Sequence, residues 1–174
     1  MRGSLPWQPY GPSVEHLVAP PVRRLAATVP GVEVAPINPA VADTAEFCRT
    51  YEVPLANSAN CVVIAGRRGE ETRYAAAMVL ASMQADVNGV IRKYLGTRKA
   101  SFAPMDDAVA LTAMECGGIT PIGLPDMWPI LVDDHVLAAG DVVIGAGIRG
   151  AKVLVPAASL LELPGAEQLA LARG

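Results

Sequence analysis

Glu115-Cys116-Gly117-Gly118-Ile119-Thr120-Pro121-Ile122-Gly123 is the stretch of this chain that most restricts its fold and its function. The two adjacent glycines carry no Cβ, so the backbone can turn sharply and approach another group closely. Pro121 fixes its own φ and has no N–H, which limits the shapes open to the loop. Such a loop can direct main-chain amides and carbonyls at a ligand without a reactive side chain. A tight turn between core elements explains the same composition and stays open as the alternative.

The composition around this loop is that of a folded domain with an aliphatic core. Hydrophobic residues make up 52% of the 174 residues and aromatic residues only 5%, so Ala, Val, Leu and Ile must supply most of the core. No apolar run approaches the roughly 18 residues that span a membrane, and the start of the chain lacks the apolar centre of a signal peptide. The three cysteines are widely spaced and form no CxxC. We therefore expect no metal, no cofactor and a reducing, cytoplasmic location.

The net charge of −3 argues against broad binding to nucleic-acid backbones, which requires a basic surface. It does not exclude contact with one end of an RNA through a local patch. Two groups of basic residues are candidates for such a patch, with ordinary solvated charge as the alternative: Arg67, Arg68 and Arg73, and Arg92, Lys93, Arg98 and Lys99.

The order of turn, cap and periodicity signals predicts an α/β domain of the α+β type with a largely antiparallel sheet. Residues 1–12 are rich in proline and predict an extended arm, residues 13–164 a single domain, and residues 165–174 a C-terminal tail that frays. The expected helices cover 13–28 with a break or kink at Pro20-Pro21, 43–51, 86–95, 104–114 and 157–163. The expected strands cover 32–37, 61–65, 71–85, 130–132, 141–144 and 153–155.

The segment Gly145-Ala146-Gly147-Ile148-Arg149-Gly150 matches the GxGxxG pattern of dinucleotide-binding loops. That function requires a helix to begin at the second glycine, with its N-terminus facing a pyrophosphate. The residues that follow, Ala151 to Pro156, instead resemble a strand. We therefore expect a glycine-rich hairpin.

Reactive side chains give little support to familiar catalytic groupings. There is no Ser-His-Asp arrangement, and the two histidines, His16 and His135, form no zinc motif. Asp133 and Asp134 are explained as turn residues more simply than as acids or bases. Cys116 could act as a nucleophile, although a free cysteine at a helix end is usually a small apolar residue.

From about Cys61 to Leu163 the chain resembles the YbaK family of aminoacyl-tRNA deacylases, a module that also occurs as the editing insertion of bacterial prolyl-tRNA synthetases. Three segments carry the resemblance: Tyr94-Leu95-Gly96-Thr97-Arg98-Lys99-Ala100-Ser101-Phe102, residues 111–123 with Gly117 and Pro121 in the family's GxxxP positions, and residues 145–150. The resemblance implies a bent mixed sheet or pseudo-barrel with helices packed outside. It also implies hydrolysis of the ester between a wrong amino acid and tRNA.

Two positions depart from the family pattern. Better-known members have a lysine at the start of the strand that here contains Asn60. Asparagine is neutral and offers two donors and one acceptor, so the point charge of an ammonium is missing at this position. Ala113-Met114 stands where members often have Gly-Tyr, which changes the expected pocket wall.

Together with the resemblance, the loop implies a site built mainly from backbone groups. Gly117 and Gly118 are expected to donate amides to the developing oxyanion, with the Thr120 hydroxyl as a further polar group. Asn60 is expected to hold the substrate amino group or the attacking water. A free ribose hydroxyl of the tRNA is expected to position the water or stabilise the leaving oxygen, which would explain a site without an obvious general base. The residues expected to bind substrate are Ile119, Pro121, Met114, Gly147 and Arg149; a pocket walled by three of them, Ile119, Pro121 and Met114, would suit a small amino acid such as alanine.

Three functions follow from these features. The first is a deacylase that acts in trans on the acceptor end of mischarged tRNA, with transient contact to a synthetase and no contact with a membrane. The second is a binding module that recognises an aminoacyl group or a protein partner but has lost the reaction, because Asn60 replaces the lysine. The third is hydrolysis of another small acyl ester or amide. Within the first, a bulky residue at Gly118 is expected to abolish turnover and leave the fold intact. The amino acid, the tRNA and the oligomeric state stay open.

Overall fold

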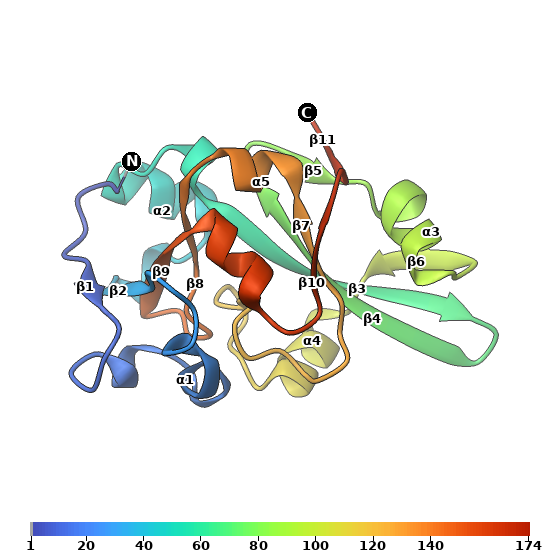
Figure 1. Cartoon of the computed structure of the whole chain (residues 1–174), viewed down its shortest axis with the longest axis horizontal. Helices are drawn as coiled ribbons and strands as arrows, with labels where there is room; N and C mark the ends of the chain where they lie inside the picture. Colours follow the sequence, from blue (N-terminus) through green and yellow to red (C-terminus); the bar gives the residue numbers. More distant parts are fainter. Residues whose placement is uncertain (1) are drawn as a thin grey trace.

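Three β-sheets form the frame of the structure, a computed structural model that describes residues 2–174 (Figure 1). The order is β1-β2-β9-β8 in the four-stranded sheet, β10-β7-β4-β3-β6 in the five-stranded sheet and β11-β5 in the small one. Among the strand pairs of residues 2–174, only β10 with β7 and β4 with β7 are parallel. The expected mixed, largely antiparallel α+β fold is therefore confirmed, with two main sheets instead of one. A bridge between Ser58 and Val143 joins β3 to β8 and so connects them.

The strands have the following bounds: β1 Gln8–Pro9, β2 Glu33–Pro36, β3 Ala59–Arg68, β4 Glu71–Leu80, β5 Gln84–Ala85, β6 Lys99–Phe102, β7 Ile130–Asp133, β8 Asp141–Gly145, β9 Ala151–Pro156, β10 Ala166–Leu169 and β11 Ala172–Arg173. The α-helices are α1 Pro20–Ala26, α2 Thr44–Tyr51, α3 Arg92–Leu95, α4 Met105–Thr112 and α5 Asp134–Ala138. Short helical segments of other types are η1 Glu15–Leu17, η2 Pro39–Val41, η3 Leu55–Asn57, η4 Val87–Ile91 and η5 Ala157–Glu162.

The hairpin of β3 and β4 is the longest element, and its tip projects at the end of the molecule opposite the N-terminal residues (Figure 1). Its alanine-rich strand β4 is buried on both faces. Ala76 and Met78 belong to one core cluster, whereas Ala75 and Ala77 belong to another. Burial on both faces explains why the strand predicted for this segment is confirmed despite the helix propensity of alanine.

The helix predicted over residues 13–28 is broken at the proline pair, which is one of the two outcomes expected there, and it is not kinked. Only η1 and α1 form there, and Pro20 and Pro21 stand at the N-terminus of α1. Proline is tolerated in the first turn because an amide there has no partner within the helix. The pair therefore begins a helix here and does not bend one.

We expected residues 165–174 to fray, but in the structure strand pairing holds them. Strand β10 pairs with β7 over Ala166 to Leu169, and β11 pairs with β5. Leu171 is 1% exposed, and its amide and that of Ala172 both donate to Asp133 Oδ1, at 3.0 and 2.9 Å. An anchored apolar side chain with satisfied backbone amides holds the segment in place.

Strand β9 lies between two core clusters, and its successive side chains point alternately to one cluster and to the other. Val153 and Val155 face the largest cluster, and Leu154 faces a smaller cluster around Phe47 of α2. Lys152 lies on the same face as Leu154, since side chains two apart on a strand share a face. The fold thus directs one lysine toward an apolar cluster.

Candidate functional site

The glycine loop and the β8–β9 hairpin hold each other through backbone contacts. Gly147 N–H donates to Gly118 O at 2.6 Å, and Glu115 N–H donates to Gly147 O at 2.9 Å. Arg149 N–H donates to Glu115 Oε1 at 2.7 Å. A Cβ on Gly118 would lie 2.7 Å from the backbone carbonyl of Ile148, so only glycine allows this approach.

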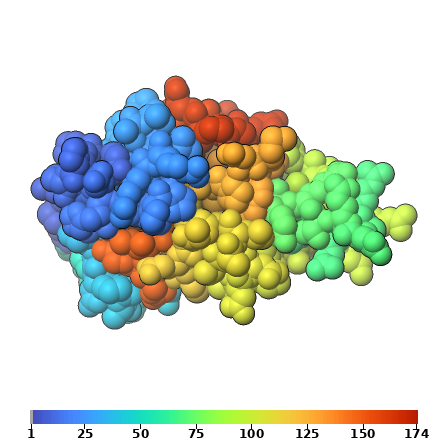
Figure 2. Space-filling model, turned by 90° about the horizontal axis from the view of Figure 1, so that it is seen from below, coloured from blue at the N-terminus to red at the C-terminus, as the bar shows by residue number. Residues whose placement is uncertain are grey.

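These two segments meet in the middle of one face of the molecule. In Figure 2 the segment after α4 lies between the N-terminal residues and the β3–β4 hairpin, with the β8–β9 region beside it. The hairpin expected for residues 145–150 is confirmed, because β9 pairs antiparallel with β8. A helix that could bind a pyrophosphate does not follow these glycines.

A cavity of about 250 Å³ lies beside this junction. The start of β3, the glycine loop, the ends of β8 and β9 and the start of α2 supply its walls. Three predicted site residues, Asn60, Gly117 and Ile119, line it together. The structure thus brings the loop and the Asn60 strand to one shared space.

Asn60 and Gly117 present polar groups at this cavity. Asn60 Oδ1 accepts a hydrogen bond from Thr44 Oγ1 at 2.7 Å, which fixes the amide and leaves Nδ2 as its donor for a ligand. Gly117 has a φ of +82°, and a Cβ there would lie 2.3 Å from Arg149 Nη1. Among residues 2–174 the amide of Gly117 has no backbone acceptor, so it remains available as a donor.

Three other predicted residues of the loop region do not line this cavity. The amide of Gly118 donates to Glu115 O at 2.9 Å, so it is not the free oxyanion donor that we expected. Thr120 is fully buried, and its hydroxyl has no hydrogen-bond partner in the described part of the chain. Met114 is 2% exposed, and its Sδ accepts from the Thr120 amide at 3.5 Å. Internal turn contacts use the Gly118 amide and Met114 Sδ, and burial removes Thr120 from the cavity.

Gly147 and Arg149 support the loop and do not line the cavity. Gly147 is buried, and a Cβ there would lie 2.4 Å from that of Ala19. The Arg149 guanidinium donates to Pro39 O at 3.3 and 3.2 Å and to Cys116 O at 3.2 Å. It therefore ties the loop to η2, and its donors are largely used within the protein.

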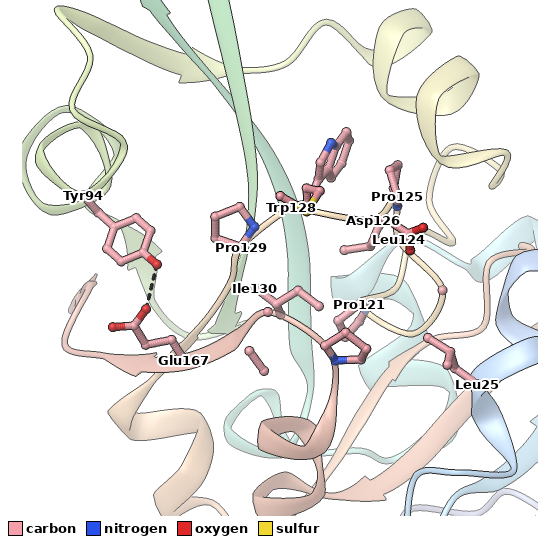
Figure 3. A pocket seen from close by; sticks show the side chains of 15 residues that line it. Leu25, Tyr94, Pro121, Leu124, Pro125, Asp126, Trp128, Pro129, Ile130 and Glu167 are labelled. Carbon is pink, nitrogen blue, oxygen red and sulfur yellow. Dashed lines mark hydrogen bonds between the residues drawn. The ribbon is translucent and has the colours of Figure 1, made fainter.

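Pro121 lines a different and larger cavity of about 660 Å³ (Figure 3). Tyr94, Trp128 and Glu167 also border that space, and the Tyr94 hydroxyl donates to Glu167 Oε2 at 2.6 Å. Asn60 and Gly117 are not part of its lining. The smaller cavity is the better candidate site because the free donors of the loop and of β3 converge there.

Sequence reasoning missed Lys152, which lines the same cavity as Asn60. The side chain is 8% exposed; its Nζ donates to Ala42 O at 3.3 Å and lies 5.0 Å from the centre of the Phe47 ring. Burial, the largest influence, lowers the pKa of Lys152, and the charge of Arg149 acts in the same direction. The signal that could have revealed it is a lone lysine within the apolar strand run 151–155.

The remaining reactive groups do not form a second site. Cys61 borders the cavity, but burial raises the pKa of its thiol to about 12, so it is not a thiolate at neutral pH. Cys116 is exposed and does not line the cavity. Asp133 accepts from the amide of His135 at the start of α5, which confirms its role as a turn and cap residue.

Neither a metal site nor a membrane span is found in the described chain. No group of His, Cys, Asp and Glu among residues 2–174 is arranged to hold a metal ion. In the same residues no helix has the length and apolar character that crossing a membrane requires.

Comparisons with known proteins agree with this arrangement. A model of the aminoacyl-tRNA editing domain family matches residues 38–163. A protein proposed to be a trans-editing enzyme for prolyl-tRNA synthetase has a similar structure, with a TM-score of 0.74 and 20% identity over 90% of this chain and 99% of that chain. A hypothetical protein gives a TM-score of 0.75 and 18% identity over 86% and 97% of the two chains. A search of the curated proteins gave no match. At these identities the structural likeness establishes a common fold.

Proposed function

Because the chain belongs to the aminoacyl-tRNA editing domain family, we propose that it hydrolyses the ester that joins a wrongly attached amino acid to tRNA. The observation that carries the proposal is the cavity of about 250 Å³ at which Asn60, Gly117 and Ile119 meet. Two donors there, the Gly117 amide and Asn60 Nδ2, are left free by the bonds within the protein. Such donors are what an ester needs from a site without a nucleophilic side chain.

In the proposed reaction, water attacks the ester carbonyl carbon and the bond from that carbon to the ribose oxygen breaks. The ribose oxygen takes up a proton, and the products are a free amino acid and tRNA with a free terminal hydroxyl. The Gly117 amide donates to the carbonyl oxygen as negative charge develops on it. Asn60 Nδ2 donates to the attacking water, and the neighbouring ribose hydroxyl passes the proton.

The size of the cavity supports a small amino acid as substrate. At about 250 Å³ it falls below the roughly 300–1,000 Å³ of typical ligand pockets. Ile119 forms part of its wall on the loop side. Each additional methylene of the substrate changes binding by about 1–3 kcal/mol, so a pocket of this size discriminates mainly by exclusion.

Basic residues at the outer end of the five-stranded sheet provide a contact surface for tRNA in this proposal. The two clusters of the sequence lie side by side there, because Arg67 of β3 pairs with Lys99 of β6. Arg68, Lys93 and Arg98 are also exposed. Local positive charge can hold the phosphates of one tRNA end although the chain is acidic overall. We place the reaction in the cytoplasm, where charged tRNA and its synthetases meet.

The test is release of labelled amino acid from a panel of purified mischarged tRNAs at physiological salt. We expect turnover of at least one small aminoacyl ester, and a loss of about 10²–10³ in kcat for Asn60→Ala. Asn60→Asp keeps the shape and removes the donor, and Gln168→Ala on β10 serves as the control. No release from any member of the panel would exclude the proposal.

The same panel addresses the binding-module alternative. Asn60→Lys adds the charge that better-known family members have at this position. Activity that arises only in this variant would favour a module that has lost the reaction. Equal hydrolysis of a small acyl ester with and without tRNA would favour the third function.

A further inference from the structure

Lys152 is a buried cation on the apolar face of β9. It is 8% exposed and shares its face with Leu154, which belongs to the cluster around Phe47. An ammonium loses most of its hydration in such surroundings, and the fold gains nothing from the charge unless a partner compensates for that loss. A lysine at this place therefore requires an explanation.

The protein itself compensates this charge only in part. None of the ion pairs found among residues 2–174 includes Lys152. The carbonyl of Ala42 accepts one of its three N–H groups, and the Phe47 ring lies against the ammonium. The carboxylate of Asp43 acts to raise the pKa of Lys152, but it is exposed and lies 3.6 Å from Arg149 Nη1.

The donors that remain are next to the proposed reaction site. Lys152 lines the cavity together with Asn60 and Gly117. Its partner across the strand pair is Gly145, and a Cβ there would lie 2.5 Å from Gly118 O. Directly opposite residues of an antiparallel pair face the same side, so Lys152 and the glycine loop border the same space.

We propose that the Lys152 ammonium binds the anionic oxygen that forms on the substrate carbonyl during hydrolysis. This inference rests on the proposed function, and it adds a charged donor to the neutral donors Asn60 and Gly117. A fixed cation in a site that excludes water stabilises a developing negative charge more than a neutral amide does. The free amino acid leaves as the carboxylate, and the ammonium stays protonated throughout.

The kinetic test compares Lys152→Met with the parent on the tRNA that the parent deacylates. Methionine keeps the length of the side chain and removes the charge, and it suits the apolar surroundings. We expect kcat to fall at least 100-fold and KM to change less than threefold, with a melting temperature equal to or above that of the parent. Leu154→Met, on the same face of β9, is the matched control and should keep kcat. A Lys152→Met variant with the kcat of the parent would overturn the proposal.

A binding test separates this proposal from the reaction itself. The probes are adenosine carrying alanine through an amide, which is planar and neutral, and the corresponding phosphonate, which is tetrahedral and anionic. Calorimetry should show at least 30-fold weaker phosphonate binding to Lys152→Met and less than threefold weaker amide binding. If the parent releases no amino acid but this difference is found, the proposed function fails, and what stands is that Lys152 binds a tetrahedral anion in this cavity. Equal loss for both probes would show a structural role only and would overturn the inference.

Discussion

Replacing Gly118 by alanine should destabilise the fold measurably although only one methyl group is added. The new Cβ would lie 2.7 Å from both C and O of Ile148 and 2.9 Å from its N. These are backbone atoms of the β8–β9 hairpin, so no side-chain rotation can make room. Overpacking of this kind costs about 1–3 kcal/mol, and the reduced freedom of the unfolded chain offsets roughly 0.4–1 kcal/mol of it. The midpoints of these two ranges give a net loss of about 1.3 kcal/mol.

Thermal unfolding measures this loss, and Gly150→Ala provides the matched control. Gly150 lies in the same hairpin, but the nearest atom to an added Cβ is Ile148 Cδ1 at 4.0 Å, so alanine fits there. For a chain of this size about 1 kcal/mol shifts Tm by roughly 2–4 °C. Gly118→Ala should therefore melt roughly 3–5 °C lower than the parent, whereas Gly150→Ala melts at the same temperature or slightly higher. Equal melting temperatures for the two variants would refute the contact between the loop and the hairpin. A bulky residue at Gly118 is thus expected to disturb the fold, and our expectation that it would leave the fold intact is revised.

Three further predictions concern regions outside the loop. Asp133→Asn should lower the unfolding free energy by about 1.5–3 kcal/mol at pH 7, because the carboxylate accepts several hydrogen bonds that the amide of asparagine cannot accept equally well. Burial raises the pKa of this carboxyl. The hydrogen bonds from the amides of Leu171, His135 and Ala172 and from the His135 ring lower the pKa by more, so the net pKa is lowered. Because the folded-state pKa lies below the ordinary value of 3.8, this stabilisation is fully present above pH 3.8 and is lost as the pH falls through the lowered pKa. The difference in unfolding free energy between variant and parent, measured in urea, should therefore vanish below pH 3.8. A difference that stays constant at all pH values would contradict the prediction. Leu171→Ala should cost about 2–4 kcal/mol, and a cost near zero in urea unfolding would show that the C-terminal segment frays after all. Lys99→Gln should weaken tRNA binding and reduce the slope of log K against log salt by about 1, whereas an unchanged slope would remove this residue from the tRNA surface.

The sequence predicted the elements whose signals are local. The β8–β9 hairpin and the helices expected over residues 43–51 and 86–95 all formed. In each case a glycine, a cap or a short apolar run decides the conformation within a few residues. The prediction failed where a distant partner decides: β10 is a strand because β7 lies beside it, and no local signal announces that pairing.

The candidate site was predicted in part for the same reason. The resemblance pointed to Asn60, Gly117 and Ile119, and these residues do share a cavity. Which loop amides are free could not be predicted, because this depends on internal bonds such as that from Gly118 to Glu115. Lys152 was missed because a lysine in a strand is normally taken as a surface residue, and only the packing of β9 against α2 shows that it is buried.

The contact between loop and hairpin also makes the rim of the cavity stiff. Where side chains separate two segments, rotamer changes absorb small displacements; here backbone meets backbone, so a shift of one segment moves the other by the same amount. The first turn of α1 adjoins this assembly, since Ala19 N–H donates to Ala146 O at 3.0 Å. A change in the packing of the N-terminal residues can thus alter the spacing of the groups that line the cavity.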